Sequence, residues 1–130
     1  MDRKDAKILD ILRKNGRANY VDIAKEVELT EGGVRNRVKK LVQSGTIEKF
    51  TVKLKNQKAI VLLKLRTTSL EEMVATIRPL AEDVFELAGD YDLGILLEAN
   101  TMEELNDTVD KIRAIPGVGE SRTLVKLVVR

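Results

Sequence analysis

Five polar side chains in one short stretch of this 130-residue chain are suited to contacting a nucleic acid. Arg35 can pair bidentately with the edge of a guanine, and Asn36 can do the same with an adenine. Lys39, Lys40 and the hydroxyl of Thr30 are better suited to phosphate oxygens, which fix the register of a protein on a duplex without reading its sequence. The stretch therefore combines groups that read bases with groups that hold the backbone.

Three further residues of the same stretch belong to this predicted DNA-binding surface. Gly32 and Gly33 each weaken a helix by about 0.5–1 kcal/mol relative to alanine, and the return that we expect is a close approach of the backbone to DNA. Arg37 lies nearer to the apolar side of the predicted helix, where it can brace the fold or reach a phosphate sideways. The predicted DNA-binding residues are Thr30, Gly32, Gly33, Arg35, Asn36, Arg37, Lys39 and Lys40.

A helix is needed to present these groups, and the local sequence predicts one. Thr30 is a good N-cap residue, and Leu29 before it can act as a hydrophobic staple. Ser44-Gly45 ends the helix. Apolar residues at i, i+4 and i+7 mark its buried side: Val34, Val38 and Leu41. The opposite side then carries Gly32, Asn36, Lys39 and Lys40, with Arg35 on its flank.

Two shorter amphipathic helices are predicted before it. The first runs from about Lys4 to Lys14, and the second is capped by Asn19 and ends near Val27. A helix, a tight turn and a cationic second helix are typical of a helix-turn-helix, which places its second helix in the DNA major groove. The alternative is an amphipathic surface helix with a solvated cationic face, and the preceding helix and turn favour the helix-turn-helix.

The segment Ile47–Leu54 alternates loosely between apolar and polar residues, which predicts a strand. It could be a wing on the DNA backbone or a hinge, and we favour a hinge with occasional phosphate contacts. Asn56-Gln57-Lys58 is the favoured domain boundary, because it is short, polar and followed by an apolar run. The predicted domains are a helix-turn-helix domain at 1–50, a linker strand at 51–58 and a second domain at 59–130.

Charge is distributed unevenly along the chain. Residues 1–66 contain 17 Lys and Arg against 8 Asp and Glu, a net charge of +9, whereas residues 67–130 contain 6 against 13, a net charge of −7. The first part is suited to a polyanion such as double-stranded DNA.

Composition also limits the chemistry that the chain can perform. Cysteine and histidine are both absent, which excludes disulfides and thiolate chemistry and removes the commonest general base and metal ligand. We therefore expect no catalytic residue, no metal and no cofactor. No apolar run is long enough to cross a membrane and no signal segment follows Met1, so we expect a cytoplasmic protein.

The second half alternates strands and helices. Branched apolar runs predict strands at Ala59–Leu65, Val84–Ala88, Leu93–Ala99 and Ser121–Val129. Capping boxes at Ser69–Glu72 and Thr101–Glu104 predict the starts of two helices. The order βαββαβ predicts a ferredoxin-like domain, a four-stranded antiparallel sheet with two helices on one face. The predicted fold class is α+β: an all-α, winged-helix-like helix-turn-helix domain followed by a ferredoxin-like domain.

The sheet face that the two helices leave open needs a partner. We expect it to carry the branched apolar residues Val61, Leu63, Val125 and Leu127. A second copy of the chain is the simplest partner, so the sequence predicts a homodimer through the sheets. A dimer also suits a helix-turn-helix, because paired heads read half-sites about one helical turn or more apart.

The turn Gly89-Asp90-Tyr91-Asp92 places two carboxylates and a phenol among apolar strands. One interpretation is a plain hairpin turn, because Gly and Asp are common turn residues. The other is a binding site.

In order and spacing, these segments resemble the Lrp/AsnC family, the feast/famine transcription regulators, over nearly the whole chain. The segments that carry the resemblance are Asp5–Leu9, Asp22–Lys25, Leu29–Leu41, Ser44–Ile47, Gly89–Asp92, Ile115–Val118 and Thr123. The resemblance implies dimerisation through the ferredoxin-like domain, assembly in many cases into an octamer, and binding of a free amino acid in clefts between dimers.

The resemblance also implies which residues bind the effector: Gly89, Asp90, Tyr91, Asp92, Ser121 and Thr123. Asp90 and Asp92 could receive an α-amino group, and backbone amides or Thr123 could receive the α-carboxylate.

The chain departs from the family pattern at three places. Glu28 stands in the tight turn where the family usually has glycine, and a left-handed conformation there costs about 1 kcal/mol. Gly32-Gly33 replaces the usual Ser/Thr-rich helix start, and the segment from Phe50 to Ala59 is short.

These features favour a sequence-specific DNA-binding transcription regulator that is modulated by a free amino acid. The alternative is a DNA-architectural protein without a small-molecule effector. A ligand-binding module that does not bind DNA is disfavoured by the +9 half. An enzyme is disfavoured as well: the architecture resembles that of the sirohaem decarboxylases, which rely on histidines, and this chain has none.

Overall fold

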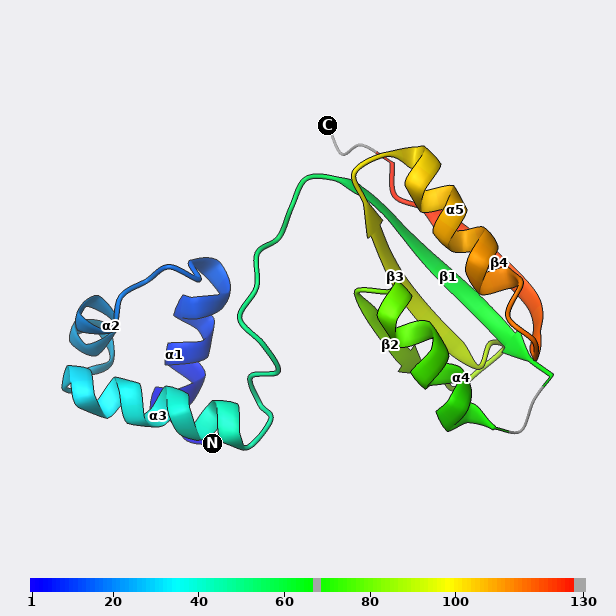
Figure 1. Ribbon diagram of the computed structural model, residues 1–130. Coiled ribbons are helices and arrows are strands. Elements are labelled where there is room, and N and C mark those ends of the chain that lie inside the picture. Colours follow the sequence, from blue (N-terminus) through cyan, green and yellow to red (C-terminus); the bar gives the residue numbers. More distant parts are fainter. Residues whose placement is uncertain (67–68, 128–130) are drawn as a thin grey trace. The chain divides into compact units, whose positions relative to one another are not determined.

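The computed structural model describes residues 1–66 and 69–127. The chain forms two compact units, Met1–Leu54 and Lys55–Arg130 (Figure 1). Each unit has a hydrophobic core of its own. No helix in the described part of the chain is both long enough and apolar enough to cross a membrane.

The first unit contains three helices, α1 (Arg3–Lys14), α2 (Tyr20–Val27) and α3 (Glu31–Gln43), which confirms the three predicted from the sequence. Each begins at a residue whose side chain accepts a backbone N–H bond, as N-cap residues do: Asp2, Asn19 and Thr30. The core between the helices is aliphatic: Ile8, Ile23, Ala24, Val27, Val34 and Val38.

The turn between α2 and α3 contains a strained residue. Glu28 has φ 57° and ψ 50°, so the left-handed conformation predicted there is confirmed. Two lysines of α1 support this end of α2: Lys4 Nζ donates to the Glu28 carbonyl and Lys7 Nζ to the Glu26 carbonyl, each at 3.1 Å. Cations are favourable at a helix C-terminus, so these bonds help to offset the strain.

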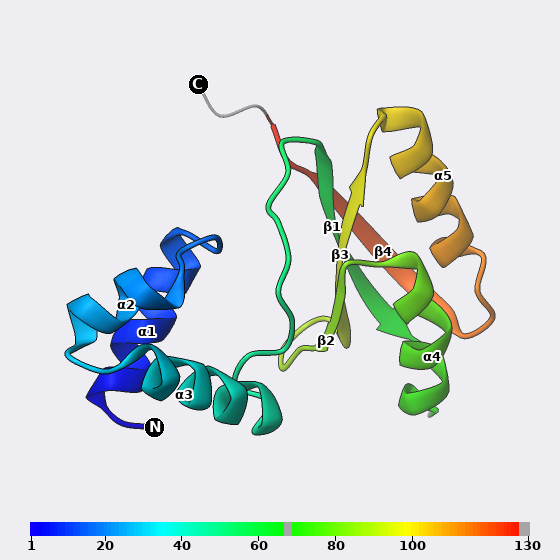
Figure 2. The ribbon, with the colours of Figure 1, turned by 60° about the vertical axis from the view of Figure 1, so that its left-hand side comes forward.

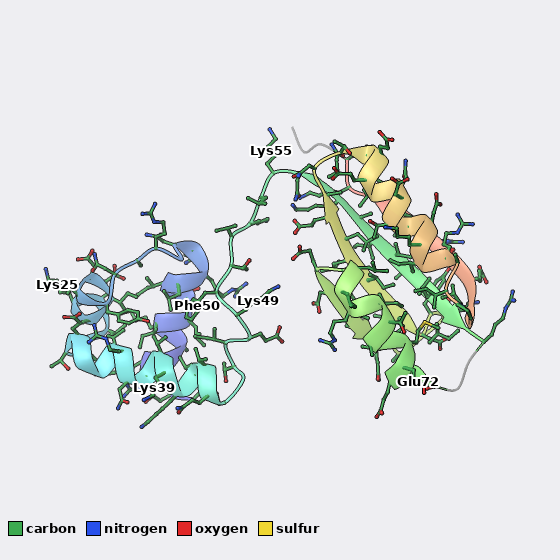
Figure 3. All side chains as sticks on the ribbon, viewed as in Figure 1. Lys25, Lys39, Lys49, Phe50, Lys55 and Glu72 are labelled. Atoms are coloured by element: carbon green, nitrogen blue, oxygen red, sulfur yellow. The ribbon has the colours of Figure 1, made fainter. Side chains whose placement is uncertain are left out.

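The strand predicted at Ile47–Leu54 is wrong, because the structure shows neither helix nor strand in that segment. Ile47 packs on the core of the first unit, and its N–H donates to the Leu41 carbonyl at 3.0 Å. Phe50, which Figure 3 labels, and Val52 follow in the segment and are 61% and 74% exposed. A strand needs a neighbouring strand for its backbone groups, and none of the described strands pairs with this segment.

The second unit is a four-stranded antiparallel sheet of β1 (Gln57–Leu65), β2 (Asp83–Glu86), β3 (Leu93–Ala99) and β4 (Val118–Val125) in the order β2-β3-β1-β4. Helices α4 (Leu70–Ile77) and α5 (Met102–Arg113) lie on one face, as Figure 2 shows, and a 3₁₀ turn η1 (Arg78–Leu80) follows α4. The predicted fold class, α+β with a ferredoxin-like second domain, is confirmed.

Several predicted boundaries shift by a few residues. β1 begins two residues before Ala59, β2 covers 83–86 instead of 84–88, and β4 begins at Val118 instead of Ser121. β4 ends at Val125, so the strand predicted to continue through Lys126 and Leu127 is shorter than expected, and the predicted end at Val129 lies outside the described residues.

Of the two capping boxes predicted in the second half of the chain, only one has a capping hydrogen bond from its N-cap side chain. At α5, Thr101 Oγ1 accepts from the Glu104 N–H at 3.2 Å. At α4, Ser69 occupies the N-cap position but its side chain makes no capping hydrogen bond, so the capping box predicted there is wrong.

The residues predicted for the open face of the sheet are also wrong. Val61 and Leu63 are fully buried in the core beneath the helices, and Val125 pairs with buried Ala59 on that same side. Leu127 follows the end of β4 and is exposed. Side chains alternate along a strand, so an error of one residue moves a whole set to the other face.

The open face instead carries the alternate residues of each strand. Its exposed apolar side chains are Ile60, Phe85 and Leu124, with Leu62 and Leu96 partly covered. Gly94 pairs with Phe85, and a Cβ on Gly94 would collide with the Phe85 ring. At one end of this face Lys58 and Glu98 form an ion pair of 2.5 Å, and the hydrogen bond from Lys58 lowers the pKa of the Glu98 carboxyl.

Candidate functional site

Helix α3 presents the predicted contact residues on the side opposite to its core contacts. Val34, Val38 and Leu41 are at most 5% exposed, which fixes the buried side. Asn36, Lys39 and Lys40 are exposed, as expected from the helical period. Figure 3 shows the Lys39 side chain projecting from α3 on the side turned away from α1. In the described part of the chain, the side chains of these three residues make no hydrogen bond or ion pair.

The two glycines at the start of α3 have different surroundings. A Cβ on Gly33 would lie 3.2 Å from Thr30 Oγ1, the atom that accepts the Gly33 N–H bond at 3.0 Å. Gly33 therefore leaves room for the N-cap. A Cβ on Gly32 would meet nothing within 4 Å, so packing inside the chain does not require glycine there. The role of Gly32 at the DNA surface stays a prediction, whereas Gly33 has a structural reason of its own.

Arg35 is exposed but not free. Its Nη2 donates to Glu31 Oε1 at 2.8 Å, and its guanidinium carbon lies 5.7 Å from the centroid of the Tyr20 ring. We did not predict Glu31 or Tyr20 as part of the site. An acidic and a basic residue four positions apart on a helix commonly form a stabilising ion pair. The contact of Glu31 with Arg35 could therefore have been predicted from their spacing.

Arg37 is held more firmly than Arg35. Its Nη1 bonds Asp2 Oδ2 at 2.6 Å and Asp5 Oδ1 at 3.1 Å, and its side chain is only 29% exposed. These bonds connect the middle of α3 to the start of α1. Of the two roles considered for Arg37, bracing the fold is therefore the one that its observed contacts support. The hydrogen bond from Arg37, with a further bond from the Asp5 N–H, lowers the pKa of Asp2 to about 2. The same partners raise the pKa of Arg37.

The observed boundary changes the charge comparison. Residues 1–54 contain 13 Lys and Arg against 8 Asp and Glu, a net charge of +5. Four of the cations counted in the +9 half belong to the second unit: Lys55, Lys58, Lys64 and Arg66. The first unit is still basic, and α3 has four cations and one acid.

The turn predicted as an effector site is hydrogen-bonded to the end of β1 through Asp92. Asp92 Oδ2 accepts from the Leu65 N–H at 2.7 Å, and the Asp92 N–H donates to the Leu63 carbonyl at 2.8 Å. Lys64 Nζ lies 5.5 Å from the Tyr91 ring centroid. Asp92 therefore already uses its carboxylate within the fold, whereas Asp90 is exposed and Gly89 adopts φ 133°.

The predicted effector residues of the last strand lie near the same end of β1. Ser121 pairs with Leu63 and Thr123 with Val61. Ser121 lines an open cleft of about 500 Å³ between the end of α5 and the start of β4. The other lining residues are Asp110, Arg113, Ala114, Gly119 and Glu120, and none was predicted. The turn at 89–92 and Thr123 do not line this cleft, so Ser121 is the one predicted effector residue among its lining residues.

Comparison with known families assigns both units. The family described as winged helix-turn-helix DNA-binding matches residues 1–48, and the family described as the Lrp/AsnC ligand binding domain matches residues 58–128. The regulator LysM of Saccharolobus solfataricus is 38% identical to this chain, over 96% of this chain and 93% of its own length. The chain belongs to the Lrp/AsnC family. As a member it is a helix-turn-helix transcription regulator with a ligand-binding domain, which confirms the predicted DNA-binding regulator of the Lrp/AsnC type.

Solved structures agree on the fold. The crystal structure of PH0061 superposes with a TM-score of 0.86 at 23% identity, covering 100% of this chain and 95% of the other. The regulator NMB0573 of Neisseria meningitidis, solved as a complex with L-Met, superposes with a TM-score of 0.76 at 24% identity and covers 98% and 90% of the two chains. At these identities the likeness concerns the fold.

Proposed function

We propose that this Lrp/AsnC chain reads a specific DNA sequence through α3 and that a free amino acid modulates its DNA binding. The observation that carries the first part is the exposed side of α3, where Asn36, Lys39 and Lys40 stand together without side-chain partners in the described part of the chain. An amide suited to adenine and two ammonium groups suited to phosphates are the groups that base reading and backbone positioning require.

We propose that the effector binds in the cleft at the end of α5. Arg113 can hold an α-carboxylate, and Asp110 or Glu120 can accept an α-ammonium group, so the lining matches the two charges of a free amino acid. A relative of the same fold was solved with L-Met. Asp90 and Asp92 remain the sequence-based candidates, and Asp92 is disfavoured because its carboxylate holds the Leu65 N–H.

A homodimer through the open face of the sheet completes the proposal. Ile60, Phe85 and Leu124 are between 37% and 50% exposed there, and an apolar sheet face is stabilised by burial against a second copy. Larger assemblies up to an octamer remain a prediction from family resemblance. Light scattering on the purified protein measures the assembly, and Leu124→Lys should shift a dimer to a monomer.

The alternative function is a DNA-architectural protein without an effector. It shares the same basic helix, and the cleft lined by Arg113 and Glu120 favours the regulated protein. We infer further that the protein acts in the cytoplasm, where its DNA partner is found, and that it catalyses no reaction.

One experiment tests the DNA and effector proposals together. Sequences bound by the full chain are selected from random DNA, with each of the twenty amino acids present in turn. A recovered consensus supports sequence-specific reading, and a change in yield with one amino acid identifies the effector. Selection of no consensus contradicts the first proposal, and identical results in all conditions favour the architectural alternative.

A further inference from the structure

Helix α3 contains a single acidic residue, Glu31, among four cations. Phosphates dominate the affinity of proteins for DNA, and a carboxylate on the contacting helix opposes that attraction. An acid in the first turn of a helix is ordinarily explained by the helix dipole. That explanation does not require Glu31 to reach another side chain, yet its Oε1 lies 2.8 Å from Arg35 Nη2.

Arg35 is held from two sides. Glu31 binds one of its N–H groups, and the ring of Tyr20 at the start of α2 lies 5.7 Å from its guanidinium carbon. A guanidinium has five N–H donors, so this bond to Glu31 leaves others for a further partner. The side chain is 60% exposed, so a further partner can approach it.

We propose that Glu31 and Tyr20 are positioning residues that make Arg35 a reader of guanine instead of a binder of phosphate. This inference rests on the proposed function, because it concerns how α3 chooses its DNA sequence. A mobile arginine binds any nearby phosphate, whereas a guanidinium fixed in one orientation matches the N7 and O6 acceptors of one base edge. Glu31 also repels the phosphates that would compete for Arg35. The Glu31–Arg35 ion pair therefore lowers the affinity for all DNA and raises the preference for one base. Specificity of this kind comes from disfavouring the wrong sequences.

The test compares Glu31→Ala with the wild-type chain in two assays: selection from random DNA, and titration of selected and random duplexes at several salt concentrations. We expect the guanine preference at one position of each half-site to fall about tenfold. Affinity for random DNA should rise, and the slope of log K against log salt should steepen by about one unit as Arg35 gains a phosphate. Specific preference and non-specific affinity therefore move in opposite directions, which a purely structural role of Glu31 would not produce.

Three further variants separate the contributions. Arg35→Ala should lose preference at the same position as Glu31→Ala. Tyr20→Leu should also reduce that preference, and because it changes no charge it does not itself alter the electrostatic attraction to DNA. Glu26→Ala is the matched control: it removes an exposed acid from α2 in the same unit, so it should raise affinity for random DNA and leave the base preference unchanged. Circular dichroism verifies that each variant is folded.

Three results would overturn the inference. If Glu31→Ala leaves the guanine preference intact, or if specific and non-specific affinities fall together, Glu31 only stabilises the helix and the proposed function still stands. If Arg35→Ala leaves that preference intact, another residue reads the guanine. A wild-type chain that selects no sequence would remove the proposed function itself, and this outcome is visible before any variant is made.

Discussion

The exposed side and the flanks of α3 carry similar cations with different surroundings. On the exposed side, Lys39 and Lys40 have no side-chain partner within the described part of the chain. On the flanks, Arg35 is paired with Glu31, and Arg37 with Asp2 and Asp5. A cation that is already paired must break or share that bond before it can bind DNA. A count of basic residues on a helix therefore overstates the number available to bind phosphates. Nearby carboxylates determine which of these residues are available.

The largest effect that sharpens this comparison is expected from Asn36→Ala. If Asn36 reads an adenine edge, its loss should relax the choice of base at one position by about 1–3 kcal/mol, which is roughly 5-fold to 150-fold. Selection from random DNA with wild-type and variant chains measures the change. An unaltered consensus would move Asn36 out of the reading surface.

Lys39→Ala should weaken binding to all sequences alike and lower the salt slope by about one unit, because one phosphate contact is lost. Arg37→Ala is the comparison: its cation is held by Asp2 and Asp5, so the salt slope should stay close to that of the wild type while the thermal midpoint falls. Equal losses of slope in both variants would contradict the distinction between exposed side and flank.

Substitutions of the two glycines of α3 are expected to have smaller effects, and Gly32→Ala should change stability and DNA affinity in opposite directions. Gly32→Ala should stabilise the first unit by about 0.5–1 kcal/mol, because nothing obstructs the added methyl and alanine favours a helix. It should at the same time weaken DNA binding if the backbone approaches DNA there. Gly33→Ala lacks this gain, because its methyl presses on the Thr30 cap. Denaturant unfolding and a binding titration on both variants test this, and a Gly32→Ala chain that binds DNA normally would leave that glycine unexplained.

The smallest effect is expected from the pH dependence of the brace. Arg37 lowers the pKa of Asp2 from 3.8 to about 2, so the folded state favours the charged carboxylate. The stabilisation is fully present above pH 3.8 and is lost as the pH falls through about 2. Thermal unfolding between those values should show a weaker pH dependence in Arg37→Gln than in the wild type. An identical dependence in the two chains would mean that the exposed pair contributes nothing measurable.

Local signals predicted most of the first unit. Each cap joins residues three positions apart, at Asn19 and at Thr30, and the apolar residues of α3 recur every three or four positions. Each of these signals is therefore contained in a short stretch of the sequence. The order of strands and helices predicted the topology of the second unit in the same way. The strand predicted at Ile47–Leu54 was wrong because pairing depends on a neighbour that local alternation cannot supply.

The candidate sites were predicted less completely, because their contacts come from residues distant in the chain. Asp2 meets Arg37 across 35 positions, and Asp92 meets Leu65 across 27. Neither contact follows from spacing along a helix or a strand. The cleft between α5 and β4 is lined by residues of 110–121, which are close in the chain. Its shape depends on the pairing of β4 with distant β1, which the local sequence does not reveal.

The left-handed turn at Glu28 has a consequence for how this type of protein is found. The residue holds a backbone shape that glycine adopts without cost, and it does so while packing and the lysines of α1 keep the two flanking helices in place. The shape of the bend is thus imposed by its neighbours and not by the residue at its apex. A search pattern that insists on glycine at that point would pass over this chain, although its three-helix architecture is complete.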